Sequence, residues 1–224
     1  MNEQVERDFR ILEEKQYPYE PSLYADMEDT QKALRYYLKK FQNDKKYTFA
    51  LANAYTDAAK GVIEDHGYSE NYEITFIDCN GTETTATPDT AIRSYYLEAL
   101  ALIRKLEEEH PNSYDAFYSE TYLEYAEYVA DSHNSYENDI KNAYEQALAS
   151  VKNSDIYSLN LKVEIYESLL EKDTYLCDEE KAEYASQLSC VYEQLLSYYN
   201  SKTTYITDMI KYWKDFVSEV SAES

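Results

Sequence analysis

Residues 140–148 read Ile-Lys-Asn-Ala-Tyr-Glu-Gln-Ala-Leu, and the apolar positions of this stretch return twice elsewhere in the chain. Ile92 stands 48 residues before Ile140, and Leu188 stands 48 residues after it. Apolar residues at spacings i, i+4, i+7 and i+8 form the buried stripe of a helix. The further copies complete the stripe with Tyr96, Ala99 and Leu100, and with Tyr192, Leu195 and Leu196. A helical stripe that returns at a fixed period is typical of stacked-repeat proteins.

The sequence therefore predicts an all-α protein of about four antiparallel helix pairs, which form a single helical-repeat domain over residues 1–224. Only three glycines and four prolines occur in 224 residues, which favours long helices with short connections. The last helix, over 203–220, carries Trp213 in its apolar stripe and is expected to cap the array. The other helices are expected over 2–16, 22–42, 45–64, 89–109, 113–131, 136–152, 155–171 and 178–200.

An insertion over residues 68–88 interrupts the helical pattern. Residues 72–77 alternate and are rich in strand-forming side chains, and Asn80-Gly81 is a strong hairpin signal. We expect a small β-hairpin, either on the binding face of the array or as an ornament of it. Gly61 and Gly67 are expected to loosen the preceding helix near its end.

The chain is strongly acidic, with 21 Lys and Arg against 44 Asp and Glu and a formal net charge of −23. This charge argues against nucleic acid and anionic membranes as partners, because both need cationic side chains. Basic peptides, basic proteins and cations remain, as does a simple soluble acidic surface. The 27 tyrosines stand mostly at helical spacing, which favours core packing with the hydroxyl at the rim.

The segment from Glu109 through Pro111-Asn112 to Phe117-Tyr118, together with the repeated stripe, resembles the tetratricopeptide repeat family. The departure is the period, because that family repeats at about 34 residues and this chain repeats at 48. The resemblance implies a TPR-like α-solenoid with a concave groove that binds protein or peptide segments. Some members hold a partner's C-terminal carboxylate with Lys and Asn, and Asn53 and Asn160 are the groove-facing candidates here.

Acidic stripes on the first helix of each pair are the candidate binding site, because the resemblance places those helices along the groove. The expected peptide-binding residues are Phe49, Asn53, Asp57, Glu120, Glu124, Glu127, Tyr128, Tyr157, Asn160, Glu164 and Glu167. Carboxylates attract Lys and Arg, and ring faces of Tyr bind cations. A protein-binding scaffold for a basic extended segment is the predicted function, although charge runs are often only solvated faces.

Two alternatives stay open. The chain could be an acidic decoy that mimics nucleic acid and occupies a basic protein's site. It could also be an enzyme with a site near His66 and the hairpin, although the sequence shows no phosphate loop, metal-ligand spacing or nucleophile elbow. We therefore expect no catalysis, no cofactor and no metal. Residues 1–6 show no signal-peptide pattern, and no apolar run approaches membrane-spanning length, so a cytoplasmic location is expected.

Overall fold

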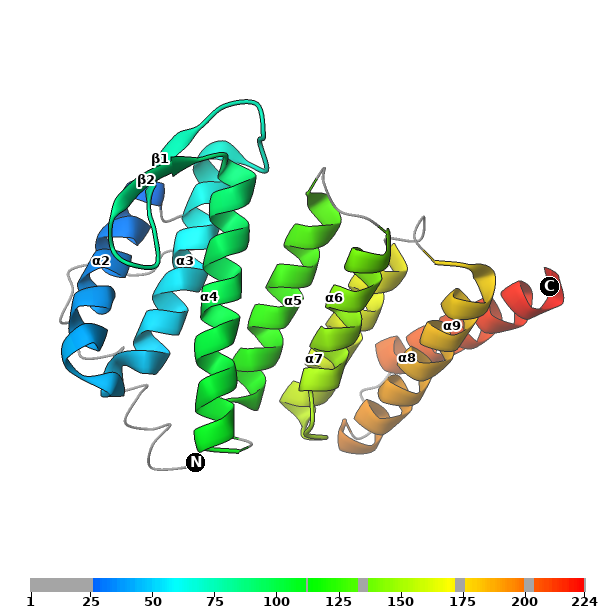
Figure 1. Ribbon diagram of the computed structural model, residues 1–224. Helices are drawn as coiled ribbons and strands as arrows, with labels where there is room; N and C mark the ends of the chain where they lie inside the picture. Colours follow the sequence, from blue (N-terminus) through cyan, green and yellow to red (C-terminus); the bar gives the residue numbers. More distant parts are fainter. Residues whose placement is uncertain (1–25, 112, 133–136, 172–175, 200–203, 224) are drawn as a thin grey trace. The chain divides into compact units, whose positions relative to one another are not determined.

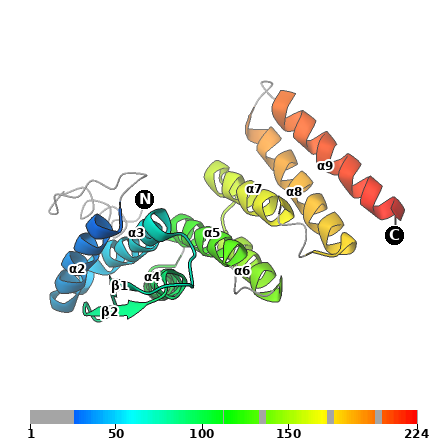
Figure 2. The same cartoon turned by 90° about the horizontal axis from the view of Figure 1, so that it is seen from above.

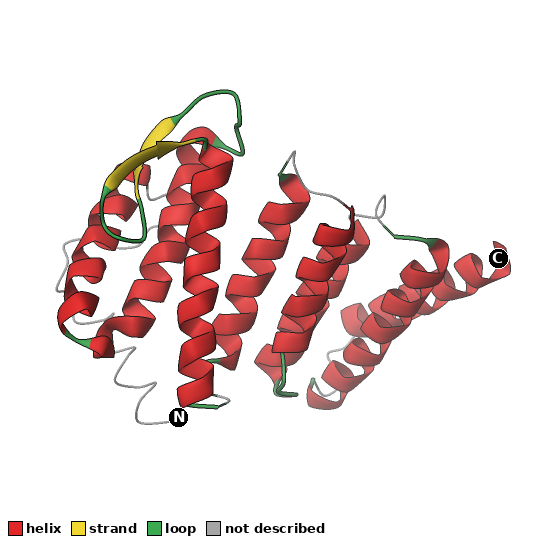
Figure 3. Ribbon diagram, in the orientation of Figure 1, coloured by secondary structure: helices red, strands yellow, loops and turns green. Residues whose placement is uncertain are grey.

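The computed structural model describes residues 26–111, 113–132, 137–171, 176–199 and 204–223, which are mostly helical (Figures 1 and 3). Contacts divide the chain into two compact units, Met1–Tyr114 and Asp115–Ser224. The single domain expected over residues 1–224 stays a prediction. The helix expected over 2–16 lies outside the described residues.

Among its described residues, 26–111 and 113–114, the first unit packs three helices and one hairpin together. Helix α2 packs against α3, and α3 packs against α4. The elements are α2 (Met27–Asn43), a 3-10 turn η1 (Lys45–Tyr47), α3 (Thr48–His66), β1 (Ile74–Ile77), β2 (Glu83–Ala86) and α4 (Pro88–Glu109). The helix expected from residue 45 therefore begins at Thr48, after this 3-10 turn.

The predicted hairpin is confirmed, and it lies beside the helices of its own unit (Figure 2). Strand β1 pairs antiparallel with β2, and Ile77 faces Glu83 in the register. Gly81 has a φ of 82°, which only glycine adopts readily, and its N–H donates to the Asp78 carbonyl at 2.9 Å. Phe76 and Ile77 are buried, and Tyr95 on α4 donates its hydroxyl to the Ile77 carbonyl at 2.8 Å. These contacts give the hairpin a structural role in the first unit.

The N-terminal turn of α2 lies close against α3, and Gly61 makes this approach possible. Gly61 is buried within α3, so it does not loosen the helix end as the sequence suggested. A Cβ at this position would overlap Thr30 Oγ1 and lie 3.1 Å from the Met27 Cα. Only a residue without a side chain fits such a close backbone approach.

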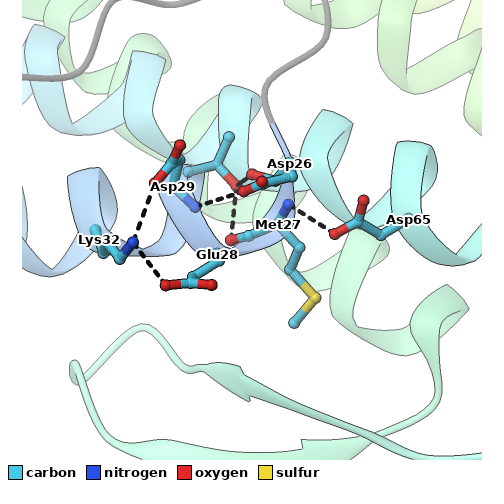
Figure 4. A network of polar contacts seen from close by, with 7 residues as sticks. Asp26, Met27, Glu28, Asp29, Lys32 and Asp65 are labelled. Atoms are coloured by element: carbon cyan, nitrogen blue, oxygen red, sulfur yellow. Dashed lines mark hydrogen bonds and ion pairs between the residues drawn. The ribbon is translucent and has the colours of Figure 1, made fainter.

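Acidic residues around this turn bind backbone donors and a lysine (Figure 4). Asp65 on α3 accepts a hydrogen bond from the Met27 N–H at 2.9 Å, and Asp26 accepts one from the Asp29 N–H at 2.9 Å. Carboxylates at a helix N-terminus satisfy the free N–H groups there. Lys32 pairs with Glu28 at 2.7 Å and with Asp29 at 3.1 Å.

The second unit consists of five helices within the part of the chain that is described. They are α5 (Asp115–Asp131), α6 (Glu137–Ser150), α7 (Ile156–Glu171), α8 (Asp178–Tyr198) and α9 (Thr204–Glu223). Helix α5 packs against α6 and α7, α7 packs against α8, and α8 packs against α9. Trp213 on α9 is only 9% exposed, as expected for the apolar stripe of a helix that packs against α8.

The first three positions of the 48-residue stripe are buried in each of its three copies, which lie on α4, α6 and α8. Its first position holds Ile92, Ile140 and Leu188, and its second holds Tyr96, Tyr144 and Tyr192, all of them buried. Each of these helices packs against the helix that precedes it, in the pairs α3–α4, α5–α6 and α7–α8. The periodicity thus predicted the core-facing side of the second helix in each pair.

Candidate functional site

The acidic stripes expected from residues 120–131 and 160–171 lie on α5 and α7, which pack against each other in the second unit. Ser168 on α7 donates its hydroxyl to Glu127 Oε1 on α5 at 3.4 Å. Burial raises the pKa of the Glu127 carboxyl, and the neighbouring charge of Glu164 raises it further. The structure therefore brings carboxylates from the two helices together.

Helical spacing places Glu120 and Glu124 on the same face of α5 as Glu127. We call the set Glu120, Glu124, Glu127, Glu164 and Glu167 the α5–α7 acidic surface. Glu120, Glu164 and the nearby Asn160 are exposed, whereas Glu124, Glu127 and Glu167 are half-buried.

The sequences of α5 and α7 provide almost no positive charge to this surface. Helix α5 has five acidic residues and neither Lys nor Arg, and α7 has three glutamates and one lysine, Lys162. A contrasting case lies elsewhere in the same unit, where Lys141 pairs with Glu180 and lowers the pKa of that carboxyl to about 2. The pKa of Glu127 shifts in the opposite direction because the carboxyl is partly buried and because its neighbours Glu164 and Glu124 are also carboxylates.

Two tyrosines of the repeated stripe interact with carboxylates of α5 and α7, a role that sequence reasoning missed. Tyr192 on α8 donates its hydroxyl to Glu167 Oε1 at 2.6 Å. Tyr144 holds the equivalent position on α6, and its pKa is raised by burial and then by the charges of Glu127 and Asp131. Because the stripe repeats every 48 residues, Tyr144 and Tyr192 hold equivalent positions. Their similar environments, each close to a glutamate, could therefore have been predicted from the sequence. No sequence pattern indicated the hydrogen bond between Ser168 and Glu127.

Two aromatic residues expected at the site are core residues, which corrects their predicted role. Tyr128 is 3% exposed and Phe49 is 1% exposed, so neither ring offers an open face to a ligand. Phe49 packs against Tyr114 with ring centroids 5.4 Å apart. Tyr157 on α7 is 46% exposed and is the one predicted aromatic side chain that a ligand can reach.

Asn53 and Asp57 form a separate pair on α3. Asn53 Nδ2 donates to Asp57 Oδ2 at 3.0 Å, so one satisfies the other. They belong to the first compact unit, whereas the α5–α7 acidic surface belongs to the second.

The histidine that an enzyme hypothesis would use is engaged with a tyrosine. His66 Nδ1 lies 3.1 Å from the Tyr72 hydroxyl, and the two rings meet edge to face. Among the described residues, no group of three or more His, Cys, Asp or Glu side chains is arranged to hold a metal ion. In the same part of the chain, no helix is both long and apolar enough to span a membrane.

Comparison with protein-family models, curated proteins and solved structures found no match for this chain, so its resemblance to tetratricopeptide repeats stays a prediction.

Proposed function

We propose that this protein is a binding module that holds a basic, extended protein segment on the α5–α7 acidic surface. The observation that carries the proposal is the packing of α5 against α7, two helices with a single lysine between them, which places the half-buried Glu127 carboxyl near Glu164. Burial and then the charge of Glu164 raise the pKa of Glu127, in agreement with that placement. Like charges held together destabilise the ionised state, and a bound cation relieves that repulsion. A lysine or arginine of the partner is the cation with the right chemistry.

Affinity on such a surface comes from several modest terms. Each exposed ion pair contributes about 0–1 kcal/mol, and the open ring of Tyr157 adds about 0.5–1 kcal/mol if a cation lies over it. Exposed charges are screened beyond about 8 Å at physiological ionic strength, so binding weakens as salt rises. The surface thus favours an extended segment with several cations over a single small ion.

We infer in addition that the pairs α3–α4, α5–α6 and α7–α8 are copies of one TPR-like solenoid repeat. The support is the shared 48-residue spacing of their buried stripe. A regular array of this kind would present α3, α5 and α7 as equivalent first helices. Small-angle X-ray scattering of the full chain tests this inference, since a superhelical array and two independently mobile units give different distance distributions.

The binding proposal is tested by calorimetric titration of the full chain with a lysine-rich peptide and a glutamate-rich peptide of equal length, at two salt concentrations. We expect binding of the lysine-rich peptide alone, and weaker binding at high salt. The variant Glu124→Gln with Glu164→Gln should lower that affinity about tenfold, because it removes two charges.

A matched control is Glu108→Gln with Glu109→Gln, which removes two exposed charges from α4 in the other unit. This control should bind almost as tightly as the parent protein. Equal binding of both peptides, or equal losses in both double variants, would leave only a general effect of net charge and would overturn the proposal.

A further inference from the structure

A cavity of about 430 Å³ lies within the second unit where α7, α8 and α9 meet. Helix α7 contributes Glu171, the N-terminal turns of α8 contribute Asp178 and Lys181, and α9 contributes Tyr212, Trp213 and Phe216. Three aromatic rings and two carboxylates thus line one cavity.

The three rings form a corner rather than a stack. Tyr212 and Phe216 both stand nearly perpendicular to the Trp213 ring, with interplanar angles of 81° and 77° and centroids 5.0 and 5.8 Å away. Trp213 is almost fully buried, whereas Tyr212, which also lines the cavity, is 57% exposed. Burial of Trp213 fixes the position of its ring. The exposure of Tyr212 indicates that the cavity is accessible from solvent.

Ring faces next to carboxylates are the chemistry that binds an alkylammonium group. The rings attract the cation and cover its methylenes, while Glu171 and Asp178, both exposed, supply opposite charge. A corner of perpendicular rings suits a compact ammonium better than a flat guanidinium, which binds by stacking on one face. The cavity therefore favours lysine over arginine.

The cavity also continues the α5–α7 acidic surface along the same helix. Glu164, Glu167 and Glu171 follow one another on α7 at i, i+3 and i+7, which places them on one helical face. Only Glu171 lines the cavity. A segment bound along α7 would reach the cavity at the C-terminal end of that helix.

We propose that this cavity binds the ammonium and aliphatic stem of a lysine carried by the basic segment. The assignment of that lysine to the segment rests on the proposed function. The lysine supplies the apolar anchor that the acidic surface lacks, because its methylenes lie among three rings.

Trp213 is the single tryptophan of the chain, so its fluorescence reports on this cavity directly. The experiment titrates the full chain with Nα-acetyl-lysine methylamide, with its Nε-trimethyl derivative and with the neutral Nα-acetyl-norleucine methylamide. We expect saturable fluorescence changes with the first two compounds and none with norleucine over the same range. Equal responses to lysine and norleucine would reduce the cavity to a nonspecific apolar pocket and overturn the proposal.

Charge variants test the role of the lining. Glu171→Gln and Asp178→Asn should each lower the affinity for the lysine compound about 2- to 5-fold, the range of a partly exposed ion pair. Lys181→Gln should raise it, because a positive charge leaves the lining. Glu179→Gln is the matched control, since Glu179 lies in the same first turn of α8 but outside the lining. A loss in Glu179→Gln as large as in Asp178→Asn would contradict the proposal.

The two proposals fail separately. If the lysine compound changes Trp213 fluorescence but the lysine-rich peptide does not bind, the cavity stands and the acidic surface fails. If the peptide binds in a salt-dependent manner and leaves Trp213 fluorescence unchanged, the acidic surface stands and the cavity proposal is overturned.

Discussion

In the first unit, acidic side chains bind backbone N–H groups and nearby cations, whereas in the second unit α5 and α7 place carboxylates beside one another. Asp65 accepts the Met27 N–H, and Arg35 on α2 pairs with Glu83 on β2. Glu127, in contrast, lies near Glu164 and has a raised pKa. An acidic composition alone does not indicate a binding site. What distinguishes the second unit is that carboxylates of α5 and α7 lie near other carboxylates.

The largest expected effect comes from the aromatic packing of the second unit. Trp213→Ala should lower the free energy of unfolding by about 3–5 kcal/mol, because a nearly fully buried ring is replaced by a cavity. Hydrogen exchange should show faster exchange of the amides of α8 and α9, while those of α2 and α3 stay protected. Replacement of the exposed Tyr212 by alanine is the control, with a smaller loss. Equal protection of α8 in Trp213→Ala and in the parent protein would contradict the packing described.

A smaller loss is expected in the first unit at the contact between α2 and α3. Gly61→Ala should cost about 1–3 kcal/mol, because the new methyl overlaps Thr30 Oγ1 and the helices must move apart. Urea unfolding followed by circular dichroism measures the loss. The double variant with Thr30→Ala should recover part of it, since the overlapping atom is removed. A stabilising Gly61→Ala, as expected for an open helix position, would contradict the close approach.

A matched pair of hydroxyl deletions compares the two units directly. Tyr95→Phe should cost about 1–2 kcal/mol, because the buried Ile77 carbonyl loses its donor. Tyr144→Phe should be neutral or stabilising, because the Tyr144 hydroxyl is buried without a hydrogen-bond partner among the described residues. Thermal unfolding of both variants measures the difference. Equal losses in the two variants would show that Tyr144 makes a bond of the same strength.

The smallest expected effect concerns pH. Glu127 has a raised pKa in the folded protein, so the folded state binds a proton more tightly than the unfolded state does. Stability should therefore rise as pH falls through the pKa of Glu127, and ionisation should reduce it at neutral pH. Glu127→Gln should raise the free energy of unfolding by roughly a few tenths of a kcal/mol at pH 7, and it should remove this part of the pH dependence of stability. Urea unfolding at pH 5 and pH 7 checks the sign, with Glu120→Gln as an exposed control on the same helix.

Sequence periodicity predicted which helix faces are buried in the core. The stripe through Ile92, Ile140 and Leu188 is buried because a fixed apolar spacing must face a core. The hairpin followed from Asn80-Gly81, since a positive φ in a tight turn needs glycine.

The rest depends on contacts between residues far apart in the chain. Tyr128 borders an acidic stripe, and helical spacing alone does not show whether its ring lies in the core or at the rim of the core. The cavity at Trp213 combines residues of three helices, so no local pattern announces it. The sequence suggested that Gly61 marks the end of a helix. Its actual role depends on the backbone of α2, which leaves no room for a side chain at this position and is distant from it in sequence.

We propose that the α5–α7 acidic surface binds a cationic side chain of a partner segment. The most direct measurement is the pKa of the Glu127 carboxyl, obtained by carbon NMR of the labelled full chain, with and without the lysine-rich peptide. We expect a pKa above the usual range for glutamate in the free protein and a fall of this pKa when the peptide binds, because a nearby cation favours the ionised form. A pKa in the usual range, or a raised value that the bound peptide leaves unchanged, would contradict it.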